Sequence, residues 1–155
     1  MSKVKLSSTS RKVCLEELIY LELLRTTDML SRGIVRVLKQ DELSATQYNV
    51  LRILRGAPDG LACGEIANRM ITRDPDVTRL LDRLEKRTLI ERGRDPRDRR
   101  TVTAKITREG LKLLARLDEP IVQLHRKQLG HLGDDRLREL AKLLLKARKA
   151  PLDRS

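Results

Sequence analysis

Apolar residues recur every three or four positions near the start of the chain, which is the spacing of a helix. The segment from Lys12 to about Lys39 contains no proline and a single glycine, Gly33. A helix of this span is roughly 40 Å long at 1.5 Å per residue, longer than the rest of the chain needs for its own core. Its surplus apolar surface therefore predicts burial against a second subunit. The apolar positions are Leu15, Leu18, Ile19, Leu23, Met29, Leu30, Ile34, Val37 and Leu38.

Three shorter helical segments follow. The first opens at Ser44, because Ser44-Ala-Thr-Gln47 has the pattern of a capping box, and it ends near Gly56. A turn over 57–60 separates it from a short helix over about 63–70. The third segment begins at Asp74-Pro75, since Asp caps helices and Pro is tolerated at the first helical position, and it runs to about Thr88. Its apolar stripe consists of Val77, Leu80, Leu81 and Leu84, and its other face carries Asp76, Arg79, Asp82, Arg83 and Lys86.

The spacing then changes to that of strands. Residues 89–92 read as one strand, and residues 101–107 alternate between an apolar set (Val102, Ala104, Ile106) and a polar set, which predicts a half-buried second strand. The charged segment 95–100 connects them, so the two strands form a hairpin with a basic tip. Thr107 can then cap a helix over about 108–129, residues 130–133 break it, and a last helix covers about 134–149. That last helix holds more leucine than one buried stripe requires, so it is, like the first helix, a dimerisation candidate.

The charge of the chain favours a polyanionic partner. Its 155 residues include 34 Lys and Arg against 22 Asp and Glu, a formal net charge of +12. Tyr20 and Tyr48 are the only aromatic residues, which weighs against single-stranded nucleic acid, because such modules stack bases on several aromatic rings. No apolar run reaches the length of a membrane span and no apolar signal region opens the chain, so we expect a cytoplasmic protein. The cysteines and histidines lack metal-ligand spacing, and no metal or cofactor is predicted.

Three helices followed by a hairpin form a winged helix-turn-helix, in which one helix enters the major groove and the hairpin, or wing, reaches the minor groove or the backbone. We expect the helix at 75–88 to meet base edges through Asp76, Thr78, Arg79 and Arg83, since Arg pairs bidentately with guanine. Taken alone, this helix also fits a solvated surface with a salt link such as Asp82 to Lys86. The wing favours DNA, because its basic residues are opposed only by Asp95 and Asp98. Those basic residues are Arg94, Arg97, Arg99, Arg100, Lys105 and Arg108.

Five segments of this order resemble the MarR family of bacterial regulators, and the resemblance spans roughly residues 12–149. They are Ser44-Ala-Thr-Gln-Tyr-Asn-Val-Leu51, Asp76-Val-Thr-Arg-Leu-Leu-Asp-Arg-Leu-Glu85, Leu89-Ile-Glu-Arg92, Asp95-Pro-Arg-Asp-Arg-Arg100 and Ile106-Thr-Arg-Glu-Gly110. The resemblance implies a non-enzymatic homodimer joined through its first and last helices. It also implies binding to double-stranded DNA at a pseudo-palindromic operator, and many such proteins are repressors relieved by a small molecule. The chain then divides into a basic tail (1–11), a dimerisation helix (12–43), a DNA-binding domain (44–110), C-terminal dimerisation helices (111–149) and a tail (150–155).

The resemblance assigns roles in the wing and marks departures. On the motif Asp98-Arg99-Arg100, Asp98 would hold the wing in shape and the arginines would reach the minor groove. Ala62 stands where a Ser or Thr often caps the third helix, so that helix start looks weaker. Two carboxylates, Asp74 and Asp76, open the recognition helix; they repel phosphate but can accept a hydrogen bond from cytosine N4. The residues that would bind an effector are not assigned.

Several alternatives remain at this stage. Some relatives sense peroxide through a cysteine near the start of the first helix, but Cys14 has only Tyr20 nearby, so we expect a small buried residue. Cys63 has no better claim to a sensing role, and His125 and His131 are expected to be surface or loop residues. A sequence-indifferent architectural DNA binder would share the basic wing. A metal-dependent nuclease using Asp95 and Asp98, or Asp74 and Asp76, is disfavoured because arginines beside each pair would neutralise it.

Overall fold

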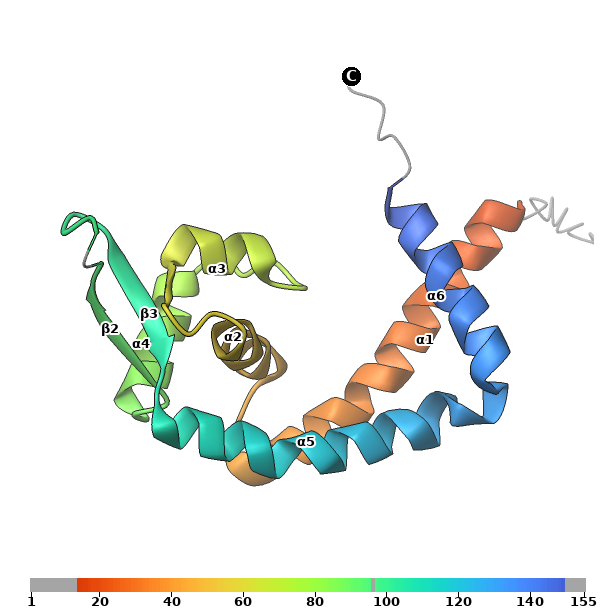
Figure 1. Cartoon of the computed structure of the whole chain (residues 1–155). Coiled ribbons are helices and arrows are strands. Elements are labelled where there is room, and N and C mark those ends of the chain that lie inside the picture. Colours follow the sequence, from red (N-terminus) through yellow and green to blue (C-terminus); the bar gives the residue numbers. More distant parts are fainter. Residues whose placement is uncertain (1–13, 96, 150–155) are drawn as a thin grey trace, which may run out of the picture. The chain divides into compact units, whose positions relative to one another are not determined.

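The computed structural model describes residues 14–95 and 97–149, and the tails predicted for 1–11 and 150–155 lie outside them. The chain divides after Arg32 into two compact units. The first contains most of helix α1 (Leu15–Leu38), whose apolar side chains at Leu15, Ile19 and Met29 are at least half exposed. The second begins at Gly33 and contains the remaining helices and all the strands (Figure 1). No helix in the described ranges is long and apolar enough to cross a membrane.

Helix α2 (Ala45–Arg55) begins as the sequence predicts. The Ser44 amide donates to Gln47 Oε1 at 2.9 Å, and the Gln47 amide donates to Ser44 Oγ at 3.1 Å. This reciprocal cap satisfies two amides that would otherwise lack partners. Val50, Leu51 and Leu54 are fully buried, so α2 lies at the centre of the core. A short 3-10 turn, η1 (Lys39–Asp41), connects it to α1.

Helix α3 (Cys63–Arg69) has Ala62 as its N-cap residue, and the methyl side chain of Ala62 cannot accept a hydrogen bond. The start is supported from the other side, because Glu65 Oε2 accepts a hydrogen bond from the Ala62 amide at 2.9 Å. One of the two hydrogen bonds of a capping box is therefore present, although the Ser or Thr that the family often places at position 62 is absent.

Helix α4 (Val77–Lys86) begins two residues later than predicted. Asp76, not Asp74, is its N-cap, and Asp76 Oδ1 accepts from the Arg79 amide at 3.0 Å. Asp74 Oδ1 instead accepts from the Asp76 amide at 2.9 Å. The expected start at Pro75 is thus wrong. Both Asp74 and Asp76 could cap the helix, and it is Asp76 that accepts the hydrogen bond from an amide of the first helical turn. The apolar stripe of α4 is buried as predicted.

The strands form a three-stranded antiparallel sheet in the order β1-β3-β2. Strand β2 (Ile90–Arg94) and strand β3 (Val102–Ile106) make the predicted hairpin, and β1 (Leu61–Ala62) was not predicted. The predicted alternation along β3 is wrong at its start, where Thr103 is 8% exposed and Val102 is 50% exposed. Thr103 is covered by pairing with Ala62 and Gly93 on both sides of the central strand. Val102 pairs with Arg94 and lines an open hollow together with residues of α3 and α4, which leaves it half exposed.

The remaining helices follow the predicted pattern. Thr107 caps α5 (Arg108–Leu129) by accepting from the Gly110 amide at 3.1 Å, and η2 (Gly130–Leu132) leads into α6 (Asp134–Arg148). Gly110 lies so close to the residue before β2 that a Cβ there would stand 2.3 Å from the Leu89 carbonyl oxygen. Helix α6 has no buried residue in the single chain. The architecture is therefore mostly helical with a small β wing, the winged helix-turn-helix predicted from the sequence.

Candidate nucleic-acid interface

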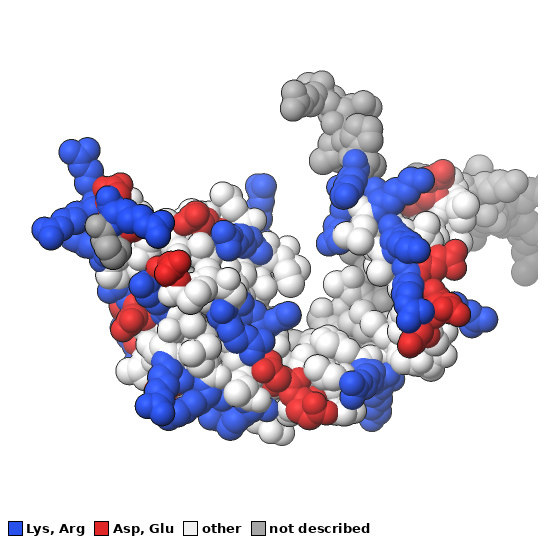
Figure 2. All heavy atoms as spheres, viewed as in Figure 1, with Lys and Arg blue, Asp and Glu red and all other residues white. Residues whose placement is uncertain are grey.

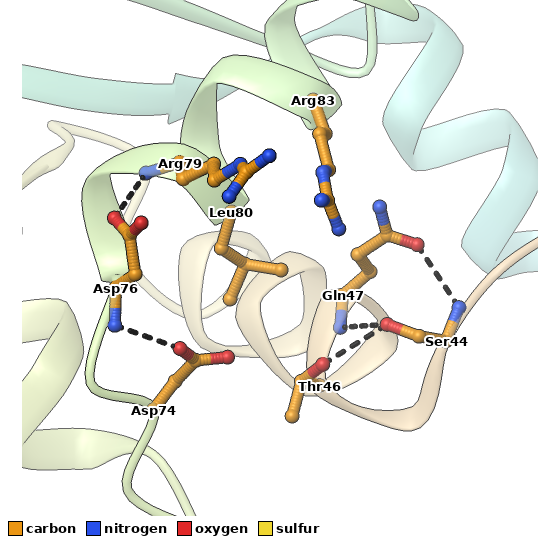
Figure 3. A pocket seen from close by; sticks show the side chains of 8 residues that line it. All are labelled: Ser44, Thr46, Gln47, Asp74, Asp76, Arg79, Leu80 and Arg83. Atoms are coloured by element: carbon orange, nitrogen blue, oxygen red, sulfur yellow. Dashed lines mark hydrogen bonds between the residues drawn. The ribbon is translucent and has the colours of Figure 1, made fainter.

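The outward face of α4 carries the residues predicted to read bases. Asp76, Thr78, Arg79 and Arg83 are all exposed. Three of them line a hollow of about 370 Å³ between α4 and the start of α2, which we call the α2–α4 hollow (Figure 3). Thr78 lies elsewhere on α4, with its hydroxyl 3.9 Å from Cys63 Sγ. The lining of the hollow is Ser44, Thr46, Gln47, Asp74, Asp76, Arg79, Leu80 and Arg83.

Charges of both signs meet in this hollow. Arg79 and Arg83 take no part in the ion pairs of the described residues, and Figure 3 shows Arg83 extending from α4 toward Gln47 of α2. The two carboxylates are each partly used by backbone amides at the start of α4. The arginines can therefore donate hydrogen bonds to an external acceptor. The carboxylates can accept hydrogen bonds, which a surface that bound only phosphate would not need.

Ser44 and Thr46 also line the hollow, a position beside α4 that the sequence did not predict. Their hydroxyls are 2.9 Å apart at the start of α2. The sequence identified Ser44 as a helix cap, but nothing in the local pattern shows that this helix start faces α4. Such a long-range neighbour is visible only in the fold.

The wing tip is held by its acidic residues. Asp98 Oδ1 accepts from the Arg100 amide and Oδ2 accepts from the Thr101 hydroxyl, both at 3.0 Å. Asp95 Oδ1 accepts from the Arg97 amide at 2.8 Å. Through these bonds Asp98 braces the turn of the hairpin. Both carboxylates bond within the turn, and no cluster of three potential metal-ligating side chains exists among the described residues.

The arginines of the tip differ in what they do. Arg94 Nη1 donates to the Arg99 carbonyl oxygen at 2.7 Å, so this side chain braces the hairpin. Arg97, Arg99 and Arg100 are exposed and make no ion pair within the described ranges. Figure 2 shows Lys and Arg side chains gathered over this end of the hairpin. The tip therefore presents three cations that acidic side chains do not neutralise.

A cluster that the sequence reading missed connects α4 to the wing. Arg92 Nη2 lies 2.6 Å from Asp82 Oδ1, and Arg92 Nε donates to Glu85 Oε2 at 2.9 Å. The hydrogen bonds from Arg92 lower the pKa of Glu85, and Glu85 raises the pKa of Arg92 in return. Asp82 thus pairs with Arg92, whereas a salt link to Lys86 was considered from the sequence. The opposite charges at 82, 85 and 92 were visible, but their meeting depends on β2 lying against α4.

A second arginine connects the end of α4 to the segment before α2. Arg87 Nη1 donates to the Glu42 carbonyl oxygen and Nη2 donates to that of Asp41, both at 2.8 Å. The Asp41 carboxylate in turn lies 3.0 Å from Arg116 of α5. Helix α4 is therefore fixed at its C-terminal end to two neighbouring elements.

The remaining sulfur and imidazole groups form no site. The expectation that Cys14 is buried is wrong for the single chain, because it precedes the first turn of α1 and is exposed there. The Glu17 amide donates to its Sγ at 3.4 Å. Cys63 is half-buried, and His125 and His131 are exposed as expected.

Comparison with known proteins agrees with this architecture. Residues 43–102 match the MarR family. Over 127 residues the chain is 30% identical to the HTH-type transcriptional regulator PecS of Dickeya dadantii (strain 3937), covering 81% of this chain and 76% of PecS.

Two solved structures resemble the fold. The crystal structure of a MarR transcription factor from Planctomyces limnophilus is 47% identical, with a TM-score of 0.66 over 86% of this chain and 98% of that one. The structure of BpsR from Bordetella bronchiseptica has a TM-score of 0.80 at 22% identity, over 90% and 99% of the two chains, and supports the fold alone. From the winged fold, the exposed arginines and these matches, the chain belongs to the MarR family of DNA-binding transcription regulators, which are not enzymes.

Proposed function

We propose that this protein represses transcription by binding a pseudo-palindromic operator as a homodimer. The observation that carries the proposal is that two sets of arginines are exposed and make no ion pair among the described residues. One set lies on α4 and the other on the wing tip. In a winged helix-turn-helix these surfaces meet the major groove and the minor groove. We assign the DNA contacts to Asp76, Thr78, Arg79, Arg83, Arg94, Arg97, Asp98, Arg99 and Arg100, with Arg94 and Asp98 acting through the shape of the wing.

Dimerisation is proposed from apolar surface that the single chain leaves exposed. Leu140, Leu143 and Leu144 share one face of α6 and are 38%, 59% and 36% exposed, and α1 also presents apolar side chains to solvent. Burying such a face stabilises association in proportion to the apolar area removed from water. We therefore propose residues 12–43 and 111–149 as the dimerisation region and residues 44–110 as the DNA-binding domain.

Control by a small molecule is a further part of the proposal. The BpsR structure concerns regulation of that protein's DNA binding by 6-hydroxynicotinic acid, so a protein of this fold can respond to a small molecule. We propose an effector for this chain without assigning its identity. We also place the protein in the cytoplasm, where its proposed operator lies.

Selection of random duplex DNA on the immobilised protein tests the proposal. We expect an inverted repeat with half-sites about 10 bp apart, bound at least about 10³-fold more tightly than random duplex. Tight binding without sequence preference would instead favour an architectural DNA binder. The carboxylates of Asp74 and Asp76 argue against that outcome, because they weaken phosphate binding without contributing to a sequence-blind clamp.

A further inference from the structure

We propose that Arg92 is a positioning residue that holds the wing at a fixed place beside the recognition helix α4 before DNA binds. The inference deepens the proposed function, on which it rests, by naming the residue through which two separate DNA-reading elements act together. Arg92 itself does not face DNA: only 27% of its side chain is exposed, and its guanidinium faces α4.

One residue joins the two elements by its side chain and by its backbone. The guanidinium donates to Glu85 Oε2 from Nε at 2.9 Å and from Nη2 at 2.5 Å, and Nη2 also donates to Asp82 Oδ1 at 2.6 Å. The backbone amide of Arg92 donates to Glu85 Oε1 at 3.1 Å. Because the guanidinium is planar and charged, bonds to two carboxylates fix its orientation as well as its position.

The position of Arg92 in the sheet explains the backbone bond. Strand β2 is at the edge of the order β1-β3-β2, so its outward amides have no neighbouring strand. Arg92 lies in the middle of β2, opposite Ala104 of β3. Glu85 accepts a hydrogen bond from the outward amide of Arg92. A side chain of α4 thereby satisfies an edge amide that a fourth strand would otherwise satisfy.

The acidic side chains of the wing tip make no bond to α4 among the described residues. Asp95 and Asp98 bond within their own turn. Among the described residues, the ion pairs between α4 and the hairpin are those of Arg92 alone. Without Arg92 the hairpin would keep its turn, its pairing with β1 and the apolar core at its base, but it would lose its polar bonds to α4. Binding would then have to restrict the wing at an entropic cost that a preorganised wing avoids.

A thermodynamic cycle separates positioning from general destabilisation. The variant Arg92→Met keeps the apolar stem of the side chain and removes the guanidinium group. We expect it to weaken binding to the selected operator about tenfold, or to the tightest-binding random duplex if no operator is recovered. In the background Arg99→Ala/Arg100→Ala, where the wing contributes little, the same change should cost less than about twofold. Equal losses in both backgrounds, or no loss in either, would overturn the inference.

Arg87→Met is the matched control. It removes the same charge five residues away, but Arg87 bonds to the carbonyls of Asp41 and Glu42 and not to the wing. Any effect of Arg87→Met should be the same in both wing backgrounds. Arg92→Lys should recover only part of the affinity, because an ammonium group cannot bond to both carboxylates in fixed geometry.

A measurement without DNA keeps this inference separate from the proposed function. Amide hydrogen exchange should speed up by about tenfold at Arg92 and neighbouring β2 residues in folded Arg92→Met, and not in Arg87→Met. Unchanged exchange would overturn the positioning role even if the wild type binds an operator. If the wild type binds no duplex at all, the proposed function fails, and faster exchange would still support the role of Arg92 in fixing the wing.

Discussion

Individual side chains at the proposed interface divide into those that face outward and those that support them. Arg79 is exposed and makes no ion pair in the described part of the chain, whereas Arg92 is largely covered and bonds to two carboxylates. The sequence predicts a DNA contact for Arg79 and no role for Arg92, because the meeting of β2 with α4 is not visible in the local pattern. Their different surroundings lead to different expectations for substitution.

Replacement of Arg79 by alanine should relax the sequence preference at one base position of each half-site. We expect a loss of about 1–3 kcal/mol in operator binding, because a bidentate contact to a guanine would be removed. Competition against operators substituted at each position measures it. A loss of the same size on random duplex would mean that Arg79 contacts phosphate instead.

Glu85 should make the stability of the protein depend on acid pH. Hydrogen bonds from Arg92 lower the pKa of Glu85 in the folded chain, so its stabilisation is complete above the unfolded pKa of about 4.3. The stabilisation is lost as the pH falls through the lower, folded pKa. The Tm advantage of the wild type over Glu85→Gln should therefore shrink between about pH 5 and pH 3. A constant difference over this range would show that the charge of Glu85 contributes nothing.

Secondary-structure elements were predictable where a repeated pattern or a cap marks them. The capping box of α2 and the apolar stripes of α2 and α4 predict those helices, although α4 begins two residues later than expected, and the Thr107 cap predicts the start of α5. Strand β1 was missed because two residues are too few to show a period. The burial of Thr103 and the ion pairs of Arg92 depend on neighbours distant in the sequence, and no local pattern encodes them.

The junction between the sheet and α5 predicts a sharp difference between two glycines. At Gly110 a Cβ would lie 2.3 Å from the Leu89 carbonyl oxygen and 2.7 Å from Ile106 Cγ1, whereas at Gly64 of α3 nothing lies within 4 Å. Gly110→Ala should lower the free energy of unfolding by about 1–3 kcal/mol through overpacking. Gly64→Ala should raise it by up to about 1 kcal/mol through helix propensity. Urea unfolding measures both, and equal midpoints for the two variants would contradict the close approach at Gly110.

The assembled protein should depend on the exposed leucines of α6. This helix has 15 residues and none is buried in the single chain, although an isolated helix of that length is marginal in water. Association with a second copy would supply the missing burial. The same surface would then control both oligomeric state and DNA binding, since a two-fold operator requires two recognition helices.

Substitution of Leu140 and Leu144 by glutamine should weaken the proposed dimer. We expect its dissociation constant to rise at least about a hundredfold, because apolar side chains would lose their burial in both subunits. Sedimentation equilibrium measures this directly. Lys142→Gln/Lys146→Gln, on the opposite face of the helix, is the matched control. An unchanged dimer in the leucine variant would show that α6 does not form the interface.

The exposed arginines of the wing tip also make it a substrate for trypsin. Arg97, Arg99 and Arg100 are exposed, and their side chains are free of ion pairs within the described residues. Proteases cut preferentially at exposed loop tips, so brief digestion should nick the chain here before it reaches the folded core. Bound DNA would shield the same bonds. The rate of cleavage at the tip would then report, without any label, whether the regulator is on or off its operator.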